Sequence, residues 1–494
     1  MLSLFSVVTL AQVMPVPAPS PASVPSRRAT PPQELVLPPE QLPPQEQLPV
    51  QEVFHPQEVR PLPGKLDAVP VFNSNSPEIV QTEGILLSTF PPQGKLVPSA
   101  HLNFPFQGRF DLFSHHIARA RSASETRTLF QGVLVYNPTN QPIRIDVLQG
   151  ASYLTRPDAL FTSLPPFVED PLGTVYAGPG SRVVNDLLRG RRSWSPLLLI
   201  PPQQAQMLMN LPIPVGNVAP SSNGRSTLLR LQSSGPVYLA NLAMFAPRNP
   251  DGGERVPTLD EWQTLLVNGG LAGPRDIPPT PMPTGSSQTK SVIERVFYGR
   301  VAGVAMGSQW QAKLTDSPKV DHLSIPQRGK AFSYGISTLY RGTLGTGQVQ
   351  SAQMLVRYPD TAYQANGNYG VQYSLTLPLK NSTKQSQTVA LAIQTPVKQD
   401  NNRGGLLFFK PPENRVFFRG PVRVRYKDER GVLQTRYIHL VQQRGQEGEP
   451  LIKLNIPGNS QREVQVDFIY PPDSTPPQVL TVRTLSDTTI GDAR

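Results

Sequence analysis

Two stretches decide the fold: GVLVYNPTNQPIRIDV at 132–147 and VQYSLTLPLKNSTKQSQTVALAI at 371–393. In each stretch apolar and polar residues alternate on both sides of an Asn-x-Thr-x-Gln turn, which begins at Asn137 and at Asn381. Alternation with a period of two is typical of half-buried antiparallel strands with one polar face. We therefore expect a hairpin at each position.

The order of segments around the two turns is also the same. Each turn is followed by an Ile-Pro step, at Ile200 and at Ile456, and then by another alternating strand. This order suggests duplication of one β-domain, and common turn chemistry in unrelated sandwiches is the alternative. We predict a mainly β fold of two antiparallel β-sandwich units, immunoglobulin-like or jelly-roll, at 65–250 and 291–485. Sharing of sheets between the two units in one larger body is left open.

One helix is predicted in the linker at 251–290. Thr258 and Glu261 form a capping box, in which each side chain accepts from a backbone N–H at the start of the helix. Trp262 begins an apolar stripe, and Gly269 ends the helix. A second helical turn is expected in FDLFSHHIARA, from Phe110 to Ala120.

The composition of the ends predicts export. Fifteen of the 57 prolines lie in the first 64 residues, so residues 13–64 are expected to be a disordered, Pro/Gln-rich tether. Residues 1–12 look like a partial signal peptide, with Thr9 and Ala11 at the cleavage positions, and residues 486–494 look like a flexible tail. No other apolar run is long enough to span a membrane. The chain has no cysteine, which excludes disulfides and thiolate chemistry.

Specific enzyme signatures are missing from the sequence. It contains no phosphate-binding glycine loop, no nucleophile elbow and no zinc helix, and no cofactor is expected. A glycosidase needs only two carboxylates that the fold brings together, and the first candidates are Asp111, Glu169 and Asp170. We regard the chain as more typical of a binding protein than of an enzyme.

Histidines gather near residue 110. If 110–120 is helical, Asp111 and His115 are neighbours on one face, and His101 could complete a metal site. The flanking phenylalanines favour a turn packed against a core instead. We therefore predict no metal site, with His101, Asp111 and His115 as weak candidates.

Positive charge is concentrated in the last part of the chain. The net charge is +11, and a strand around 422–427 places Val422 and Val424 on one face and Arg423, Arg425 and Lys427 on the other. Such a row can bind carboxylates or phosphates of an anionic polymer, and the alternative is a solvated face that discourages edge pairing. The predicted polyanion-binding residues are Arg415, Arg419, Arg423, Arg425, Lys427 and Arg436.

A second, weaker basic cluster is the loop RGRRSW, with Arg189, Arg191, Arg192 and Trp194. A plain loop or a processing site is the alternative for it. No recognised nucleic-acid motif accompanies the basic residues, so nucleic acid is not the expected partner.

Several stretches together resemble a cyanobacterial family of predicted exported proteins, catalogued only as a domain of unknown function. They are QEVRPLPGKLDAVPVFNSNSPEIVQTEGILLSTFPP, HLNFPFQGRFDLFSHHIARA, GVLVYNPTNQPIRIDVLQGASYL and the IPP segment at Ile200. The resemblance covers the chain from about Gln57 onward. It implies a location in the periplasm, at the outer membrane or outside the cell, and it brings no catalytic residues.

These observations lead to one expected function and two alternatives. We expect an exported cell-envelope or extracellular protein with a binding or scaffolding role, whose partner is an acidic surface polysaccharide. The alternatives are a carbohydrate-active hydrolase with a carboxylate pair and a structural subunit of a surface assembly.

Overall fold

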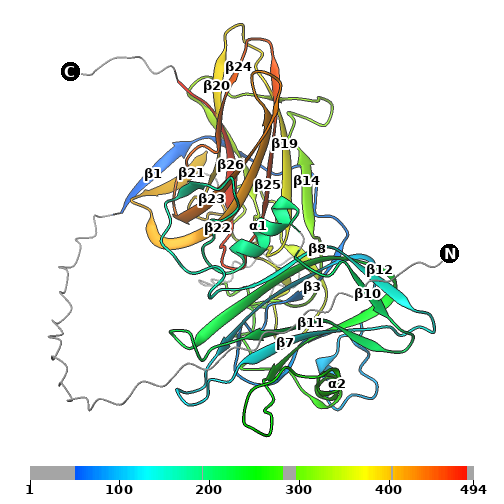
Figure 1. The fold of residues 1–494 in the computed structure, drawn as a ribbon. Helices are drawn as coiled ribbons and strands as arrows, with labels where there is room; N and C mark the ends of the chain where they lie inside the picture. Colours follow the sequence, from blue (N-terminus) through cyan, green and yellow to red (C-terminus); the bar gives the residue numbers. More distant parts are fainter. Residues whose placement is uncertain (1–49, 192, 282–295, 402–403, 487–494) are drawn as a thin grey trace, which may run out of the picture. The chain divides into compact units, whose positions relative to one another are not determined.

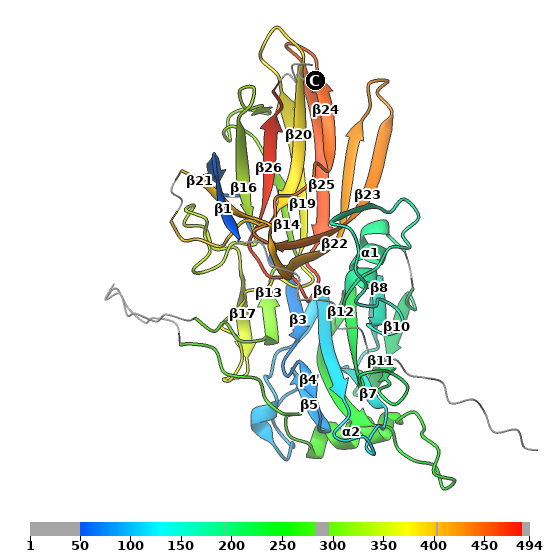
Figure 2. The same cartoon turned by 90° about the vertical axis from the view of Figure 1, so that its left-hand side faces the viewer.

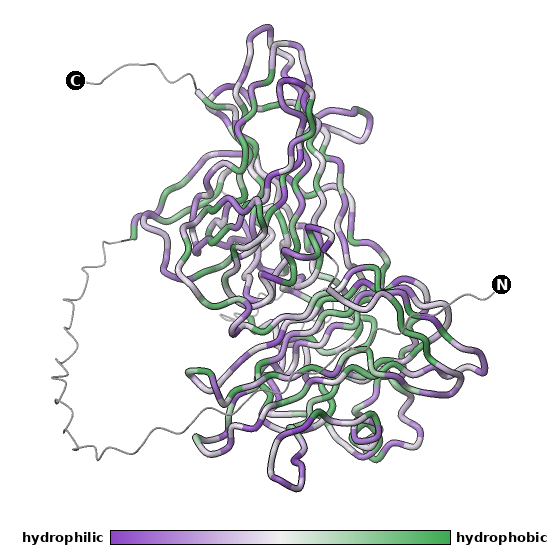
Figure 3. Tube along the Cα trace, in the orientation of Figure 1, coloured by the Kyte–Doolittle hydropathy of each residue, from purple (hydrophilic) through white to green (hydrophobic). Residues whose placement is uncertain are grey.

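The computed structural model describes residues 50–191, 193–281, 296–401 and 404–486 (Figure 1). The expected signal peptide at 1–12, the tether up to residue 49 and the tail from 487 lie outside the described residues. Within them the chain is mainly β, as predicted, with mixed and mostly antiparallel sheets and two short α-helices. Figure 3 shows apolar and polar residues interspersed along the strands.

The largest sheet contains 12 strands. Its main path is β10 (Leu197–Ile200), β8 (Ile143–Leu154), β12 (Ser222–Phe245), β6 (Phe106–Arg119), β3 (Pro70–Ser74), β13 (Ala302–Met306), β17 (Ala352–Arg357) and β18 (Gln364–Ala365). Four strands lie off this path: β11 (Ala205–Ile213), β7 (Leu129–Tyr136), β5 (Gly84–Ser88) and β4 (Ile79–Val80).

Three further sheets complete the β structure. A 7-stranded sheet contains β14 (Gln309–Lys313), β19 (Gln372–Lys380), β25 (Gln461–Ile469), β22 (Glu413–Lys427), β23 (Leu433–Arg444), β9 (Phe167–Glu169) and β15 (Leu323–Ser324). A 5-stranded sheet contains β2 (Glu58–Arg60), β16 (Ala331–Ile336), β26 (Gln478–Thr484), β20 (Gln387–Gln394) and β24 (Ile452–Ile456). A 2-stranded sheet contains β1 (Gln51–Pro56) and β21 (Gly405–Lys410).

The long strand β12 joins two layers of the first β unit. Its first part pairs with β6 and β8, and its last part pairs with β7 and β5, with a break in register between Ser233 and Val237. Apolar side chains from both layers form one core, which includes Phe110, Val133 and Leu231. The 7- and 5-stranded sheets likewise enclose one core, which is lined by β19, β25 and β22 from one sheet and β20 and β26 from the other.

The prediction of two hairpins is wrong. β7 pairs with β11 and β12, whereas β8 pairs with β10 and β12, and β19 and β20 lie in different sheets. Each Asn-x-Thr-x-Gln segment therefore crosses from one layer to the other. The prediction failed because any strand that faces a core shows alternating apolar and polar residues. The pattern is the same whether the next strand in sequence pairs with it in one sheet or packs against it from a second sheet.

Each crossing is followed by a second one at the Ile-Pro step. Residues 201–204 connect β10 to β11, and residues 457–460 connect β24 to β25. β10 lies beside β8 and β11 beside β7, just as β24 lies beside β20 and β25 beside β19. We call each set of four strands with its two crossings a double arch: β7–β8 with β10–β11, and β19–β20 with β24–β25.

One buried asparagine ties the two crossings of each double arch together. The Nδ2 of Asn137 donates to the carbonyls of Gln141 (2.7 Å), Ile200 (3.1 Å) and Pro201 (3.1 Å). The Nδ2 of Asn381 donates to the carbonyls at the matching positions, namely Gln385 (2.8 Å), Ile456 (2.9 Å) and Pro457 (3.2 Å). Both asparagines are fully buried, so these bonds satisfy backbone groups that water does not reach.

The predicted linker helix is confirmed as α2 (Leu259–Asn268), and its capping box is present. Trp262 of α2 packs against β7 and β12 in a second apolar cluster. A Cβ on Gly132 would lie 2.7 Å from the Trp262 ring, so glycine is required at this point of β7. The other α-helix is α1 (Ser181–Arg189), and a short 3-10 helix spans Pro98–Ala100.

The helical turn predicted at 110–120 is wrong, because these residues lie mostly in strand β6. Phe110, Leu112 and their polar neighbours are buried on both faces of the sheet, so the sequence shows no alternation there. The expected tether also ends earlier than residue 64. Strands β1 and β2 pair with β21 and β16, whose edges supply the hydrogen bonds that an isolated segment lacks.

Strands from both predicted units share sheets. β3 pairs with β13, and β9 pairs with β23, although each pair is far apart in sequence. Figure 2 shows β3 and β13 side by side. Among the described residues, no helix is long and apolar enough to cross a membrane.

Candidate functional site

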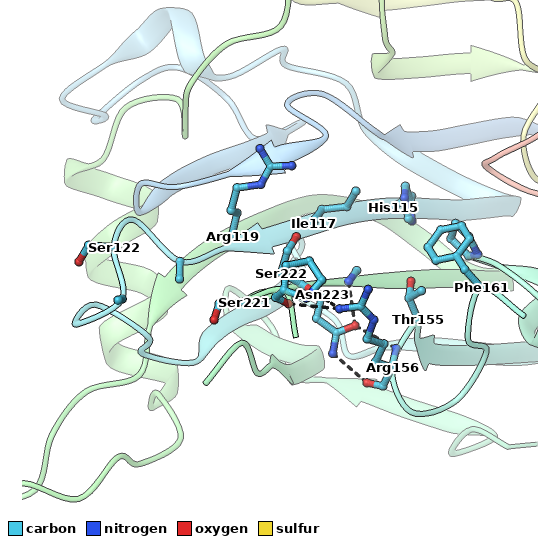
Figure 4. A pocket seen from close by; sticks show the side chains of 15 residues that line it. His115, Ile117, Arg119, Ser122, Thr155, Arg156, Phe161, Ser221, Ser222 and Asn223 are labelled. Carbon is cyan, nitrogen blue, oxygen red and sulfur yellow. Dashed lines mark hydrogen bonds between the residues drawn. The ribbon is translucent and has the colours of Figure 1, made fainter. Parts of the chain in front are cut away.

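A pocket of about 450 Å³ lies at the ends of β6 and β12 (Figure 4). The last residues of β6 form one wall, and the first residues of β12 form the next. The loop after β8 and the connection between β11 and β12 close the remaining sides. Its lining residues are His115, Ile117, Arg119, Ala120, Ser122, Ala123, Thr155, Arg156, Phe161, Pro179, Pro220, Ser221, Ser222, Asn223 and Gly224.

Arg156 and Asn223 hold the wall of this pocket. The Nη1 of Arg156 donates to the carbonyls of Ala219 (2.8 Å) and Pro220 (3.2 Å), and Asn223 accepts from the backbone N–H of Arg156 (3.0 Å). The Nδ2 of Asn223 donates back to the carbonyl of Arg156 (2.8 Å). These reciprocal bonds fix the connection at 214–221 against the loop after β8.

The charge of the pocket is positive. Its lining includes two guanidinium groups, from Arg119 and Arg156, and no carboxylate. Arg119 is exposed and makes no direct hydrogen bond or ion pair among the described residues, although the Glu78 carboxylate is near enough to interact with its charge. Burial lowers the pKa of His115 to about 3, so this imidazole is neutral at physiological pH, and its Nδ1 lies 2.9 Å from the Ser226 hydroxyl.

The pocket also offers an aromatic surface. Phe161 is 60% exposed, and Figure 4 shows it at the right of the pocket, with Arg119 on the other side of His115 and Ile117 from it. On another side the guanidinium of Arg419 lies 5.3 Å from the centre of the Phe161 ring. Ile117, Pro179 and Pro220 supply further apolar wall. A cationic end and an aromatic end together can bind an anionic ligand that also has an apolar face.

The basic residues on β22 alternate with apolar residues as predicted. Arg423 and Arg425, however, already have partners within the protein. Val422 and Val424 are fully buried, and Arg423 and Arg425 point to the other face. Both arginines contact the same oxygen of Asp467 at 3.1 Å, and Arg423 also donates to the carbonyl of Leu188 at the end of α1 (2.7 Å). These arginines therefore neutralise a buried carboxylate and contact α1.

The remaining members of the predicted polyanion-binding set divide into two groups. Arg436 lies opposite Val424 in the β22–β23 ladder, which places it on the other face of the sheet, and it pairs with Glu169. Arg419 lies near Asp473 (3.6 Å). Arg415 and Lys427 are exposed and form no ion pair within the described part of the chain.

The second basic cluster supports the loop at 170–174. Arg189 donates to Asn185 (2.8 Å) and stacks on Tyr437, and Arg191 donates to the carbonyl of Leu172 (2.7 Å) and to Asp186 (3.2 Å). Trp194 packs beside the first core. Arg192 lies outside the described residues.

The three weak metal candidates do not converge. Because β6 is a strand, Asp111 and His115 lie about 13 Å apart along it rather than on adjacent helical turns. His115 bonds with Ser226, and His101 bonds with Ser88 (2.8 Å). No group of three or more histidine, aspartate or glutamate side chains among the described residues could hold a metal ion.

The candidate hydrolase carboxylates are separated in the same way. Asp111 is buried on β6 beside Arg109, and Glu169 pairs with Arg436 in the 7-stranded sheet. Asp170 accepts from the backbone N–H of Thr174 (2.8 Å) and lies beside Arg189. Each of the three carboxylates thus has a structural partner.

Sequence reasoning missed the pocket at the ends of β6 and β12. Arg119 and Arg156 are distant in sequence and belong to no motif, and Phe161 stands alone in a loop. The one local signal is Pro220 followed by Ser221 and Ser222, which indicates a turn but not a pocket. Only the pairing of β12 with both β6 and β8 brings these residues to one pocket.

Comparisons with known proteins add a family but no activity. A family model described as "Protein of unknown function (DUF3370)" matches residues 57–484. No curated protein matches the chain.

Solved structures resemble the chain only slightly. Lac15 from a marine microbial metagenome is 10% identical, with a TM-score of 0.09; the comparison covers 74% of this chain, which spans about half (51%) of Lac15. The structure of the Macrobrachium rosenbergii nodavirus is 11% identical over 95% of this chain and 98% of that chain, with a TM-score of 0.11. Procruciferin, an 11S globulin from Brassica napus, is 11% identical over 85% and 84%, with a TM-score of 0.10.

Proposed function

We propose that this chain, which belongs to the DUF3370 family of proteins of unknown function, is an exported binding protein for anionic polysaccharide. The ligand-binding site in this proposal is the pocket between Arg119 and Phe161. One observation carries the proposal: the lining combines two guanidinium groups and an exposed phenyl ring, and it contains no carboxylate.

The chemistry of an acidic sugar fits these groups. A uronate or a sulfated sugar carries a negative group on a ring whose C–H face is apolar. Arginine binds carboxylate and sulfate oxygens through paired hydrogen bonds, and an aromatic ring stacks against the apolar face of a sugar. Arg119 is the better ligand-binding candidate, because Arg156 already donates to backbone carbonyls.

Export is part of the proposal and is supported by the sequence. The apolar stretch MLSLFSVVTLAQ resembles the apolar region of a signal peptide, with Thr9 and Ala11 at the positions before a cleavage site. In the cell envelope or outside the cell, acidic polysaccharides are among the available polyanions. A binding or scaffolding role there needs no catalytic group.

Isothermal titration calorimetry with a purified oligogalacturonate tests the pocket. Arg119→Glu should weaken binding by about 10- to 100-fold, the loss expected for a charge-assisted contact of about 1.5–3 kcal/mol. Phe161→Ala should also weaken binding, because it removes the ring on which the sugar stacks. Arg144→Glu is the matched control, because Arg144 is exposed on β8, pairs with Asp146 and lies outside the pocket. Absence of binding by the parent, or an equal loss in the control, would contradict the proposal.

Exposed cations on β22 provide a second contact for a long polymer. Arg415 and Lys427 carry no ion pair among the described residues, so their charge is available to a ligand. The double variant Arg415→Glu/Lys427→Glu should elute from an acidic polysaccharide column at lower salt than the parent. Reversal of Arg423 or Arg425 is a poor test, since it would place a glutamate beside the buried Asp467 and destabilise the fold.

A further inference from the structure

Strand β10 forms one edge of the 12-stranded sheet. β8 pairs with one side of β10, and among the described residues no strand pairs with the other side. Figure 2 shows β10 at the right-hand margin of this sheet. An edge of this kind can pair with a strand of another chain unless charge, proline or a bulge prevents it.

The backbone of β10 offers hydrogen-bonding groups at this edge. The N–H of Val147 donates to the carbonyl of Pro196 (2.9 Å), which fixes the residues of this segment that bond to β8. Bonded and non-bonded pairs alternate in an antiparallel ladder, so the even-numbered residues of β10 bond to β8. Leu197 and Leu199 therefore direct their N–H and C=O groups outward, where a further strand could bind them.

The same two leucines expose their side chains. Leu197 is 49% exposed and Leu199 is 60% exposed, and Leu148 of the neighbouring β8 is 43% exposed. The opposite face of β10 packs in the first core through Leu198 and Ile200. The strand contains no charged residue, and its pairing with β8 has no bulge. The edge therefore lacks the usual protection against pairing with another chain.

Prolines limit the length of the free edge. Pro196 precedes β10, and Pro201 and Pro202 follow it, so the strand spans 4 residues. Proline supplies no N–H to a ladder, and a long foreign strand would find few partners here. A strand of the same short length, such as β10 of a second copy, matches this edge better.

Charge on this face does not oppose self-association. Arg144 and Asp146 lie opposite Leu199 and Leu197 in the β8–β10 ladder, and their side chains form an ion pair at 3.1 Å. The face is therefore neutral, although the chain has a net charge of +11. An identical copy can approach this face without the repulsion that two basic surfaces would have.

We infer that β10 pairs antiparallel with β10 of a second copy about a two-fold axis, so that the sheet continues from one copy to the other. With Leu198 opposite the partner's Leu198, Leu197 lies opposite the partner's Leu199. The backbone groups of that pair point toward each other, so both of its hydrogen bonds can form. The exposed leucines of the two copies then make one apolar cluster. This inference goes beyond the proposed function and does not depend on it.

The area of the contact sets the expected strength of the dimer. Stable complexes bury about 1,200–2,000 Å², which is more than one short strand and three partly exposed leucines from each copy supply. We therefore expect a weak dimer, with a Kd of about 10–500 µM.

Sedimentation velocity of the full chain between about 5 µM and 1 mM tests the pairing. The parent should shift from monomer to dimer, and Leu199→Lys should weaken the dimer by about tenfold or more, because an ammonium group would enter the apolar cluster. Leu199→Pro should have the same effect, since it removes an outward N–H and leaves the bonds to β8 in place. Because Leu199 is exposed, Leu199→Lys should fold even if Leu199→Pro does not.

Leu355→Lys is the matched control. Leu355 is 43% exposed in the same sheet, but its strand β17 pairs with β13 on one side and β18 on the other. This variant should dimerise as the parent does. A chain that stays monomeric up to about 1 mM, or equal weakening by Leu355→Lys and Leu199→Lys, would overturn the inference.

Hydrogen–deuterium exchange locates the contact. Amides of β10 should exchange more slowly above the Kd of the dimer than below it, and Leu199→Lys should remove this difference. Slower exchange confined to other strands would contradict the pairing. The synthetic peptide SPLLLIPP, which copies residues 195–202, tests for a different occupant. If it slows exchange in β10 while the parent stays monomeric, the edge binds a foreign strand and the dimer is ruled out.

Discussion

The two double arches share a framework and differ in what their connections carry. Asn137 and Asn381 make matching sets of hydrogen bonds, and the connections 214–221, from β11 to β12, and 470–477, from β25 to β26, have the same length. The first connection borders a pocket with arginines and no carboxylate. The second borders a pocket with compensated charges and unpaired acceptors. The framework therefore places connections of different chemistry at equivalent positions.

A second difference lies between the second and third strands of each double arch. In the first, residues 155–196 contain β9 and α1, and in the second, residues 395–451 contain β21, β22 and β23. These insertions contact each other, because β9 pairs with β23 and Arg423 donates to the carbonyl of Leu188. The basic strand that looked like a binding face thus serves partly as an internal contact.

Removal of the two matching asparagines is the strongest test of this equivalence. Asn137→Ala and Asn381→Ala each leave three carbonyls without a buried donor, and each should lower the free energy of unfolding by about 3–5 kcal/mol. Urea denaturation measures both. Asn140→Ala, at an exposed position in the same turn as Asn137, should cost under about 0.5 kcal/mol. A cost confined to one of the two arches would break the comparison.

The pH dependence of stability should separate the two connections. Burial raises the pKa of Asp473 to about 7, above its value in the unfolded chain. Between pH 4 and 7 this carboxyl is therefore protonated in the folded state and ionised in the unfolded state. This carboxyl therefore destabilises the fold as pH rises through that window. Asp473→Asn should gain about 2–3 kcal/mol relative to the parent between pH 4.5 and 7.5.

His115, at the first pocket, should act in the opposite direction. Its folded pKa of about 3 lies below the unfolded value, so its contribution to stability is present above pH 6.5 and is lost as pH falls. Denaturation of parent, Asp473→Asn and His115→Asn at several pH values measures both slopes. A constant difference between parent and Asp473→Asn at all pH values would refute the assignment.

Gly132 marks where the outer faces of the two arches differ. In β7 this face is covered by Trp262 of α2, and Gly132→Ala should cost about 1–3 kcal/mol because the new Cβ would overlap the ring. Thr376 stands at the matching position of β19, five residues before Asn381, and is partly exposed. Thr376→Ala should change the unfolding free energy by less than about 0.5 kcal/mol. Equal costs at the two positions, by the same denaturation experiment, would contradict this difference.

Much of the local structure was predictable from sequence. The strands on both sides of Asn137 and Asn381 were found by their alternation, and α2 was found by its capping box. Strand β6 was not, because both of its faces are buried and its polar residues find partners on neighbouring strands. The candidate pockets were missed because residues such as Arg119 and Phe161 come to line one pocket only through strand pairing.

The sequence by itself determined the β character, the two Asn-x-Thr-x-Gln turns and the alternation of Val422 and Arg423, since these depend on local backbone geometry and on which side chains water accepts. Only the tertiary structure decided that each turn crosses between layers, that Arg423 and Arg425 both pair with Asp467, and that Arg119 lies at a pocket. Alternating apolar and polar residues show that one face of a strand is buried, but they do not show which other part of the chain covers that face. Long-range pairing supplies that partner, and it is encoded in the whole chain.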